Sequence, residues 1–525
     1  MGSGPPSSSS AERDHAQHPS SVSAAAQPRP AARETDSAVP NTGRGVPNTI
    51  VIGAGSSGAV VAARLAEAAR SVLLLEAGPD YRSADTPAPV AGPNFLAACA
   101  EERFIWPSVQ ARRTPQQAPR PYLRGRGVGG SSAVNAMVGM WPPPEDLVAW
   151  GEGFGSAAVQ RIQAEVELRL PRWRPPLERW SPVEQALAAA ALDAGYRWCD
   201  DYDRAGPEGI GVGPAALSWR DGRRLSTNDG YLEPLRANPY LAVRGGAEVE
   251  AILLEGRRVL GVRLVGGEEI PAGRVVLAAG AIHSPALLLR SGLQHPAIGA
   301  NLADHPSAAL SLHLTPAGRL LDAQRPLINS VLRYSSGLVP GPDGVADMQI
   351  MLMAAVGTAP ASLSTAVAQV AVMRSFGRGR VSIDGRGDPV VDFDLLQDER
   401  DRLRLRDGLR RMVALTHHRA FHSVVEVLSL EGLGRQAVEG LLADDQGLDE
   451  WLARHSGDYV HACGTCAMGE AEDPAAVVDP ISGAVHGYHG LHVIDASVFP
   501  AVPRVNTHLA AVLVAEVLVA GLLAG

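Results

Sequence analysis

The chain reads TIVIGAGSSGAVVAARLAEAARSVLLLEAG from Thr49 to Gly78, and this stretch decides the fold. A β-branched apolar run is followed by the glycine pattern G-x-G-x-x-G, a segment with helical apolar spacing, and a second apolar run that ends on Glu76. We therefore expect strand, glycine turn, helix and strand, in that order. The first glycine of such a unit makes the tight turn, the second lets a pyrophosphate approach the backbone, and the third lets the helix pack on the strand.

The unit also predicts which groups would hold the ligand. The helix N-terminus offers free N–H groups and the positive end of a dipole to phosphates. Glu76 lies at about the twenty-residue offset expected of a carboxylate that binds ribose hydroxyls. The stretch thus predicts an adenine dinucleotide site, for NAD or FAD, in preference to a glycine-rich turn without a ligand.

Composition limits the remaining possibilities. A chain of 525 residues predicts two domains or one domain with large insertions. The net charge of −9 shows no basic excess, so we expect no nucleic-acid partner. Four scattered cysteines do not make a disulfide scaffold, which favours a reducing, cytoplasmic location. Residues 1–47, rich in Ser, Pro and Ala, are expected to be a disordered tail.

The C-terminal apolar tail, His508 to Gly525, could be taken for a membrane span. It barely reaches the minimum length and carries Glu516 in its middle. We expect a buried helix that packs on the nucleotide domain, and no transmembrane segment.

Four further segments complete the expected architecture. The glycine-rich run Arg124–Met137 is either a site of close approach to a flat ligand or a connector between domains. The strand Val275–Ala278 is expected in the sheet of the dinucleotide domain. Alternating apolar patterns in Ser307–Met353 predict an antiparallel sheet and a separate substrate domain. Asp398–His417 mixes Arg and acidic residues at helical spacing, which predicts a solvated amphipathic helix.

The expected chemistry lies near the C-terminus. His461 and Asn506 each stand where a loop meets a regular element, as site residues often do. Both His461 and His508 could instead be structural histidines. Cys463 and Cys466 form a C-x-x-C pair, which could be a redox or metal pair, but we favour ordinary packing roles for both. His486, His489 and His492 have a spacing that could suggest a metal site, but we favour ordinary loop roles for them.

Together these motifs resemble the glucose–methanol–choline (GMC) oxidoreductase family of FAD enzymes, from about Asn48 to the C-terminus. GAGSSG with LEAG is similar to the family's N-terminal FAD motif, GRGVGGSSAVNAM to its first signature and GAIHSPALLLRSGL to its second. GANLADHP resembles the block that follows the second signature. HACGTCAMG and DASVFPAVPRVNTH resemble the C-terminal block that carries the catalytic pair.

The resemblance implies an α/β, two-domain fold: a Rossmann-like FAD-binding domain and a substrate domain built on an antiparallel sheet with helices. It implies FAD-binding segments at 48–150, 206–306 and 455–525, a helical cap at 151–205 and a substrate-binding domain at 307–454. By resemblance, His461 is the catalytic histidine and Asn506 the second member of the pair. The residues it implies around FAD are Gly53, Gly55, Ser56, Ser57, Gly58, Glu76, Gly130, Ser131, Asn135, Val249, Asp495, Thr507 and His508. Some members carry a histidine linked to the flavin where this chain has Val134, so FAD is expected to be non-covalent.

The implied activity is the oxidation of an alcohol to a carbonyl compound, with proton abstraction by His461 and hydride transfer to the flavin N5. The expected partners are a small alcohol and an electron acceptor, which is O2, a quinone or another carrier. Two other functions fit the same motifs: a hydroxynitrile-lyase-like enzyme on the same fold, and a non-catalytic flavoprotein or NAD-binding module.

Overall fold

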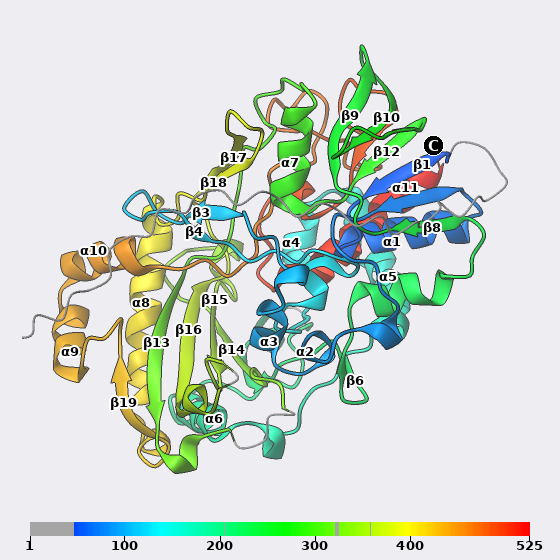
Figure 1. The fold of residues 1–525 in the computed structure, drawn as a ribbon. Coiled ribbons are helices and arrows are strands. Elements are labelled where there is room, and N and C mark those ends of the chain that lie inside the picture. The colour runs from blue at the N-terminus through cyan, green and yellow to red at the C-terminus, as the bar shows by residue number, and fades with distance from the viewer. Residues whose placement is uncertain (1–46, 205, 321–324, 358, 525) are drawn as a thin grey trace, which may run out of the picture. The chain divides into compact units, whose positions relative to one another are not determined.

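The computed structural model describes residues 47–525 except 205, 321–324, 358 and 525, so the predicted tail lies outside the described residues apart from Pro47. The described residues belong to one compact unit. Two sheets organise this unit, a parallel sheet with its helices and a larger antiparallel sheet, and they lie in different parts of it (Figure 1). This arrangement confirms the predicted mixed α/β fold.

The parallel sheet has the strand order β20-β12-β1-β2-β8. Its strands are β1 (Thr49–Ile52), β2 (Val72–Leu75), β8 (Leu241–Arg244), β12 (Arg274–Leu277) and β20 (Leu491–Val493). All four pairings are parallel. Every residue of β1 and β2 is buried, as expected of strands covered on both faces. The strand predicted near Val275 is β12, beside β1, which confirms its place in this sheet.

Two helices pack together beside this sheet, α1 (Ser56–Glu67) and the C-terminal α11 (Thr507–Ala524). The Ser57 hydroxyl donates to the Ala511 carbonyl at 2.9 Å, and Arg64 pairs with Glu516 at 2.7 Å. In the described part of the chain, only α11 is long and apolar enough to cross a membrane by length and composition, and 67% of it is buried inside the structure. The expected packing of this helix on the nucleotide domain is therefore observed.

The second sheet has six strands in the order β19-β13-β16-β15-β14-β5, and every neighbouring pair is antiparallel. Five strands come from residues 307–454, the expected substrate domain, and the first three lie in the stretch whose pattern predicted an antiparallel sheet: β13 (Ser307–Leu314), β14 (Ser330–Tyr334), β15 (Met348–Met353), β16 (Thr365–Val372) and β19 (Val425–Ser429). The sixth, β5 (Gly211–Pro214), comes from a segment expected in the FAD-binding domain and pairs with β14.

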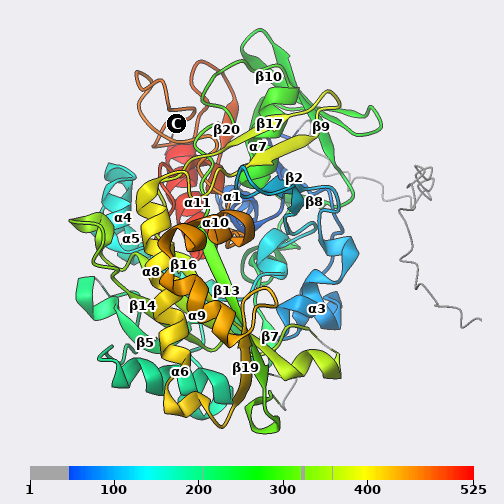
Figure 2. The ribbon, with the colours of Figure 1, turned by 90° about the vertical axis from the view of Figure 1, so that its left-hand side faces the viewer.

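Helix α8 (Glu399–Thr416) covers one face of the six-stranded sheet (Figure 2). The fit is close, because a Cβ added at Gly408 would lie 2.7 Å from the Met348 side chain. The prediction that this helix is simply solvated is wrong on its inner face. Asp401 and Arg404 are fully buried there and pair at 2.6 Å, and Asp401 also accepts backbone N–H bonds from Phe376 and Gly377.

Smaller elements connect the two sheets. Three further sheets contain β9 (Val249–Glu255), β10 (Arg258–Leu264) and β11 (Glu269–Pro271); β3 (Gln110–Arg112), β4 (Arg120–Pro121), β17 (Arg380–Ile383) and β18 (Pro389–Asp392); and β6 (Trp219–Arg220) with β7 (Arg223–Arg224). The remaining α-helices are α2 (Ala88–Ala91), α3 (Phe95–Cys99), α4 (Pro144–Val148), α5 (Ser156–Arg169), α6 (Pro182–Asp193), α7 (Gly280–Arg290), α9 (Arg435–Ala443) and α10 (Asp445–His455).

Candidate active site

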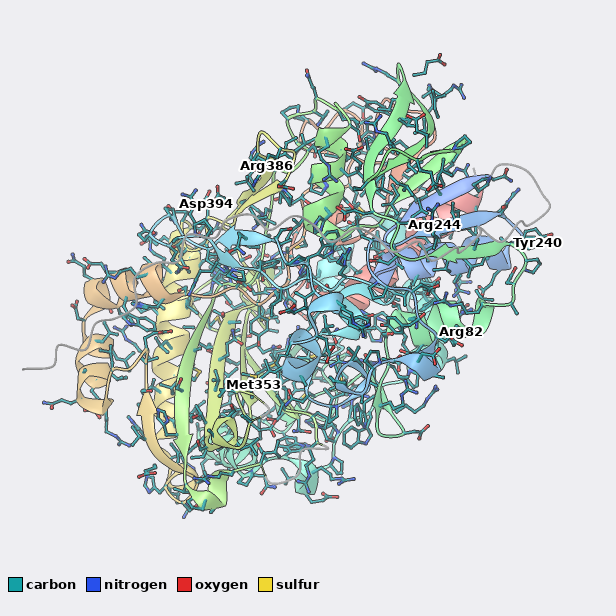
Figure 3. All side chains as sticks on the ribbon, viewed as in Figure 1. Arg82, Tyr240, Arg244, Met353, Arg386 and Asp394 are labelled. Atoms are coloured by element: carbon teal, nitrogen blue, oxygen red, sulfur yellow. The ribbon has the colours of Figure 1, made fainter. Side chains whose placement is uncertain are left out.

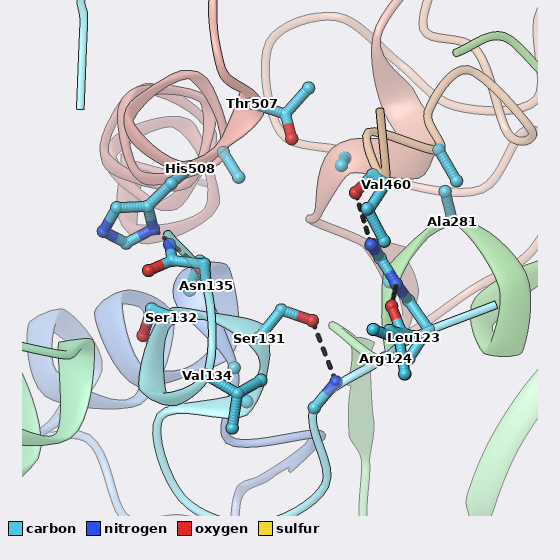
Figure 4. Close-up of a pocket in the computed structure, with 18 of the residues that line it drawn as sticks. Leu123, Arg124, Ser131, Ser132, Val134, Asn135, Ala281, Val460, Thr507 and His508 are labelled. Atoms are coloured by element: carbon cyan, nitrogen blue, oxygen red, sulfur yellow. Dashed lines mark hydrogen bonds between the residues drawn. The ribbon is translucent and has the colours of Figure 1, made fainter. Parts of the chain in front are cut away.

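A cavity of about 480 Å³ lies between the glycine turn of the parallel sheet and strands β15 and β16 of the antiparallel sheet. The 3-10 turn Gly130–Ala133, the loop around His461 and the start of α11 complete its wall (Figure 4). Of the fifteen residues predicted for the site, all but Gly58 line this one cavity. The structure therefore brings together residues that are up to 455 positions apart in the sequence.

Three of these glycines, Gly53, Gly58 and Gly130, occupy positions where a side chain would be strained or would clash. Gly53 has a φ of +95°, in the left-handed region that favours glycine. A Cβ added at Gly130 would lie 2.6 Å from the Gly55 Cα, so the glycine turn and the first signature segment meet backbone to backbone. Gly58 lies behind the cavity, where an added Cβ would lie 1.9 Å from the Gly53 carbonyl oxygen. Its role is the close packing of α1 on β1, as the pattern predicts.

The first turn of α1 faces the cavity with free backbone donors. Its N-cap is Gly55, and no side chain caps it. Because the Ser57 hydroxyl is bound to α11, only the backbone of Ser57 is available to a ligand. The Ser56 hydroxyl lies 2.9 Å from Nδ1 of His508 and so joins the starts of α1 and α11. This turn is suited to a phosphate group.

Glu76 is held by three backbone N–H groups. Ala54 donates to Oε2 at 2.8 Å, and Gly78 and Gly127 donate to Oε1 at 2.9 and 2.8 Å. These bonds fix the carboxylate at the edge of the cavity and tie the first βαβ unit to the signature segment. Oε2 has only one such donor, which leaves acceptor capacity for a ribose hydroxyl.

Asp495 and Val249 line the cavity at other points along its wall. Oδ2 of Asp495 accepts from the Gly280 N–H at 2.8 Å and from the Ser284 hydroxyl at 2.6 Å, and Oδ1 accepts from the Ser497 N–H. Burial raises the pKa of this carboxyl, and the hydrogen bonds oppose that rise. Asp495 therefore joins the start of α7 to the end of β20, where it shapes the cavity wall.

Asn135 is fixed by a residue that the sequence analysis did not identify. Its Oδ1 accepts from the Met137 N–H at 2.9 Å and from Nη1 of Arg224 at 3.0 Å, and Nη1 also donates to the Asn135 carbonyl. Arg224 is fully buried, and burial lowers its pKa to about 10. A second predicted residue, Ser131, accepts the Gly125 N–H at 3.1 Å (Figure 4).

His461 and Asn506 meet at the cavity wall, with Nε2 of His461 3.4 Å from Nδ2 of Asn506. On the other side of the ring, Nδ1 of His461 lies 2.8 Å from Nδ1 of His305. Nε2 of His305 lies 2.9 Å from the Pro503 carbonyl oxygen, which accepts a hydrogen bond and cannot donate one.

These contacts determine where the protons lie. Burial lowers the pKa of His305 to about 4, so this ring is neutral at neutral pH. Its one proton must be on Nε2 to reach Pro503, which makes its Nδ1 an acceptor. His461 then donates from its own Nδ1, and its Nε2 carries a lone pair that faces Asn506. Burial first, and then His305 and Arg124, hold the pKa of His461 well below its ordinary value, so this lone pair stays free.

The buried carboxylate of Asp304 holds the backbone around the histidines. It accepts the N–H groups of His305, Tyr459 and His461 and the hydroxyl of Tyr122, at 2.6 to 3.1 Å. Burial raises its pKa, the Asp458 charge adds to the rise, and the hydrogen bonds from Tyr122, His305 and His461 oppose it. Among the described residues, Asp304, His305 and His461 are the one group close enough together to share a metal ion. Their polar atoms bind one another and the surrounding protein instead.

Val460, directly before His461, has a φ of +62°, a conformation that β-branched residues rarely adopt. The guanidinium of Arg124 donates to the Val460 carbonyl and, at 2.6 Å, to the carbonyl of Leu123 (Figure 4). Strained backbone of this kind persists when its surroundings over-determine it, and it is common at active sites.

Of the three histidines considered for a metal site in the sequence, two bind carbonyl groups nearby and His489 is exposed. His486 and His492 bind the carbonyls of Gly469 and Ser482. Cys463 and Cys466 are free thiols, both fully buried.

In the described part of the chain, three residues of the cavity wall have a buried polar atom without a hydrogen-bond partner: Nε of Arg290, Oδ1 of Asn506 and Nε2 of His508. Buried polar atoms are rarely left unpaired in native proteins, so these are positions where a ligand is expected to bond. With the uncapped helix, the paired glycines and Glu76, they fit an adenine dinucleotide that extends from the parallel sheet to His461.

Comparisons with known proteins agree with this geometry. Residues 48–307 and 375–515 match the N- and C-terminal models of a family described as GMC oxidoreductase. The 5-(hydroxymethyl)furfural oxidase of Methylovorus sp. is 31% identical, over 89% of this chain and 97% of that protein. The oxygen-dependent choline dehydrogenase of Escherichia coli K12 is 29% identical, over 89% of this chain and 94% of that protein. The crystal structure of pyridoxine 4-oxidase from Mesorbium loti has a TM-score of 0.77 and 26% identity, and the match covers 91% of this chain and 99% of that one. The chain therefore belongs to the GMC oxidoreductase family of FAD-dependent enzymes.

Proposed function

We propose that this protein oxidises the CH–OH group of a small alcohol to a carbonyl, with His461 as the base and Asn506 as the group that orients the substrate oxygen. The observation that carries the proposal is the 3.4 Å separation of His461 Nε2 and Asn506 Nδ2 at the wall of the cavity. One hydroxyl group placed between these atoms would donate to the imidazole and accept from the amide.

The protein's own groups prepare the proton transfer. Pro503 and His305 fix the ring of His461 so that Nε2 is the basic nitrogen. The amide of Asn506 contributes positioning, because it holds the substrate oxygen beside that nitrogen. When bound, FAD supplies the acceptor for the hydride that leaves the alcohol carbon. The proton taken by His461 and that hydride together balance the conversion of CH–OH to C=O.

FAD is proposed to be held without a covalent bond. Val134, at the position where some family members carry a flavin-linked histidine, has no nucleophilic atom. The dinucleotide would be held by the α1 N-terminus, Glu76 and the signature turn. Acid precipitation should therefore release all the yellow colour into the supernatant, and colour retained in the pellet would contradict this.

The test is anaerobic and uses the purified holoenzyme. An alcohol panel is added, the flavin absorbance is followed, and air is then admitted. The proposal is supported if an alcohol bleaches the flavin of the wild-type enzyme and does not bleach that of His461→Ala, with FAD still bound to the variant. Rapid recovery in air would identify O2 as the acceptor, and slow recovery a quinone or another carrier. A flavin that no alcohol bleaches, in an enzyme that cleaves a hydroxynitrile, would replace the proposal with lyase chemistry.

A further inference from the structure

The antiparallel sheet presents an apolar wall to the cavity. Along β15 and β16 the side chains alternate: Ile350 and Val370 belong to the core under α8, whereas Met351 and Gln369 line the cavity. Met351 and Gln369 are register partners, and Met353, labelled in Figure 3, pairs with Val367 one step further along the strands. The other apolar residues of this part of the cavity are Phe95, Leu96, Ile328 and Met137.

Gln369 is the one polar residue among the four that form this wall, and its hydrogen bonds determine which way its side-chain amide points. The Ser307 hydroxyl donates to the Asp458 carbonyl at 2.9 Å, so its oxygen must accept from the amide of Gln369, also at 2.9 Å. That contact uses Nε2 of Gln369. Among the described residues none donates to Oε1, which leaves one neutral acceptor in the wall.

Within the part of the chain that the structure describes, no residue adds an unpaired negative charge to this wall. Four carboxylates line the cavity as a whole, Glu76, Glu248, Asp458 and Asp495. Glu76 belongs to the glycine-turn side, and Glu248 lies directly before β9. Asp495 is engaged by α7, and Asp458 pairs with Arg113 at 2.6 Å.

The cavity also carries a positive charge near His461. Arg124 lines the cavity, and its charge is one cause of the lowered pKa of His461. Its guanidinium donates to the carbonyls of Leu123 and Val460 and lies over the ring of Tyr122, and among the described residues no carboxylate pairs with it.

We infer that the substrate is an uncharged alcohol with an apolar body, and that the wall formed by Met351, Met353, Val367 and Gln369 rejects cationic alcohols. This inference rests on the proposed function and specifies its substrate class. A quaternary ammonium placed here would lose its hydration without gaining a counter-charge, and Arg124 would repel it.

The test uses two alcohols of the same shape, choline and 3,3-dimethylbutan-1-ol, which differ in one positive charge. For each, the holoenzyme gives a Kd from the perturbation of the flavin spectrum and a rate constant for flavin reduction. We expect the neutral alcohol to bind roughly 100-fold more tightly than choline, since one unpaired charge must be desolvated. Equal or tighter binding of choline would overturn the inference.

A second pair, benzyl alcohol and 4-(hydroxymethyl)benzoate, tests the opposite charge. We expect benzyl alcohol to bind more tightly, and tighter binding of the benzoate would show that Arg124 and not the apolar wall selects the substrate. Because binding is measured from the perturbation of the flavin spectrum and oxidation from the bleaching of the flavin, the two properties are tested separately. If no alcohol reduces the flavin, the proposed oxidation fails, whereas the order of the Kd values still decides the substrate class.

Two variants of one position locate the effect. Gln369→Glu places a carboxylate in the wall and should shift the Kd ratio toward choline by at least tenfold. Gln369→Leu, of similar size and without charge, should leave choline rejected. A ratio that moves equally in both variants, with FAD retained in both, would mean that the wall does not sense the charge of the substrate.

Discussion

The imidazole rings of His305 and His461 meet at right angles, with their Nδ1 atoms 2.8 Å apart. Because the Nε2–H of His305 donates to the Pro503 carbonyl, this contact assigns the basic nitrogen of His461 without a carboxylate partner for either ring. His305 therefore acts as a positioning residue.

Removal of this acceptor should misplace the base. We expect His305→Leu to lower the rate constant for flavin reduction by roughly 10- to 100-fold, as small misplacements of a catalytic group do. His305→Gln, whose amide still offers both an acceptor and a donor, should recover part of the loss. Stopped-flow reduction of FAD-replete variants measures both. Equal losses in the two variants would mean that His305 serves packing alone.

The pH dependence follows from the direction of the shift on His461. Burial, His305 and Arg124 hold its pKa well below 6.5, so the ring stays neutral as the pH falls through 6.5. The rate constant for flavin reduction should therefore be flat from about pH 8 down past 6.5, the ordinary histidine pKa. A fall centred at or above 6.5 would contradict a buried, neutral base.

The parallel sheet and its site residues could be predicted because their signals are local. Glycines at fixed spacing, a strand before them and an acid after the next strand are all legible within Thr49–Gly78. The same holds for α11, where Glu516 argued against a membrane span and is indeed paired with Arg64.

The remaining site residues depend on contacts between distant segments. Arg224 meets Asn135 across 89 positions, and no motif in the sequence marks it as a site residue. His305 lies 156 positions from His461, and although its motif GANLADHP was recognised, no spacing indicates that the two rings touch. The burial of the inner face of α8 was not predicted for the same reason. Asp401 accepts its hydrogen bonds from backbone N–H groups of a loop that precedes the helix.

Arg224 provides a test of how the signature segment is held. It binds both oxygens of Asn135 and, through Nε at 3.0 Å, the Val90 carbonyl. A lysine keeps the charge but cannot reach several acceptors from one rigid plane. We expect Arg224→Lys to raise the Kd for FAD by at least tenfold, measured by flavin fluorescence after removal and re-addition of FAD. Wild-type affinity in this variant would show that Asn135 is positioned without the guanidinium.

The packing of α1 on β1 is the most demanding contact at the site, because a Cβ at Gly58 would lie 1.9 Å from the Gly53 oxygen and 3.0 Å from the Ala278 Cβ. Gly58→Ala should therefore push the helix off the strand, at a cost of roughly 1–3 kcal/mol or more. We expect a lower melting temperature and loss of FAD.

The matched control is Gly440→Ala in α9, where an added Cβ meets nothing within 4 Å. Since alanine favours a helix over glycine by about 1 kcal/mol, this control should keep FAD and melt no lower than the wild type. A Gly58→Ala protein that melts with the control and remains yellow would show that the third glycine is not required for close packing.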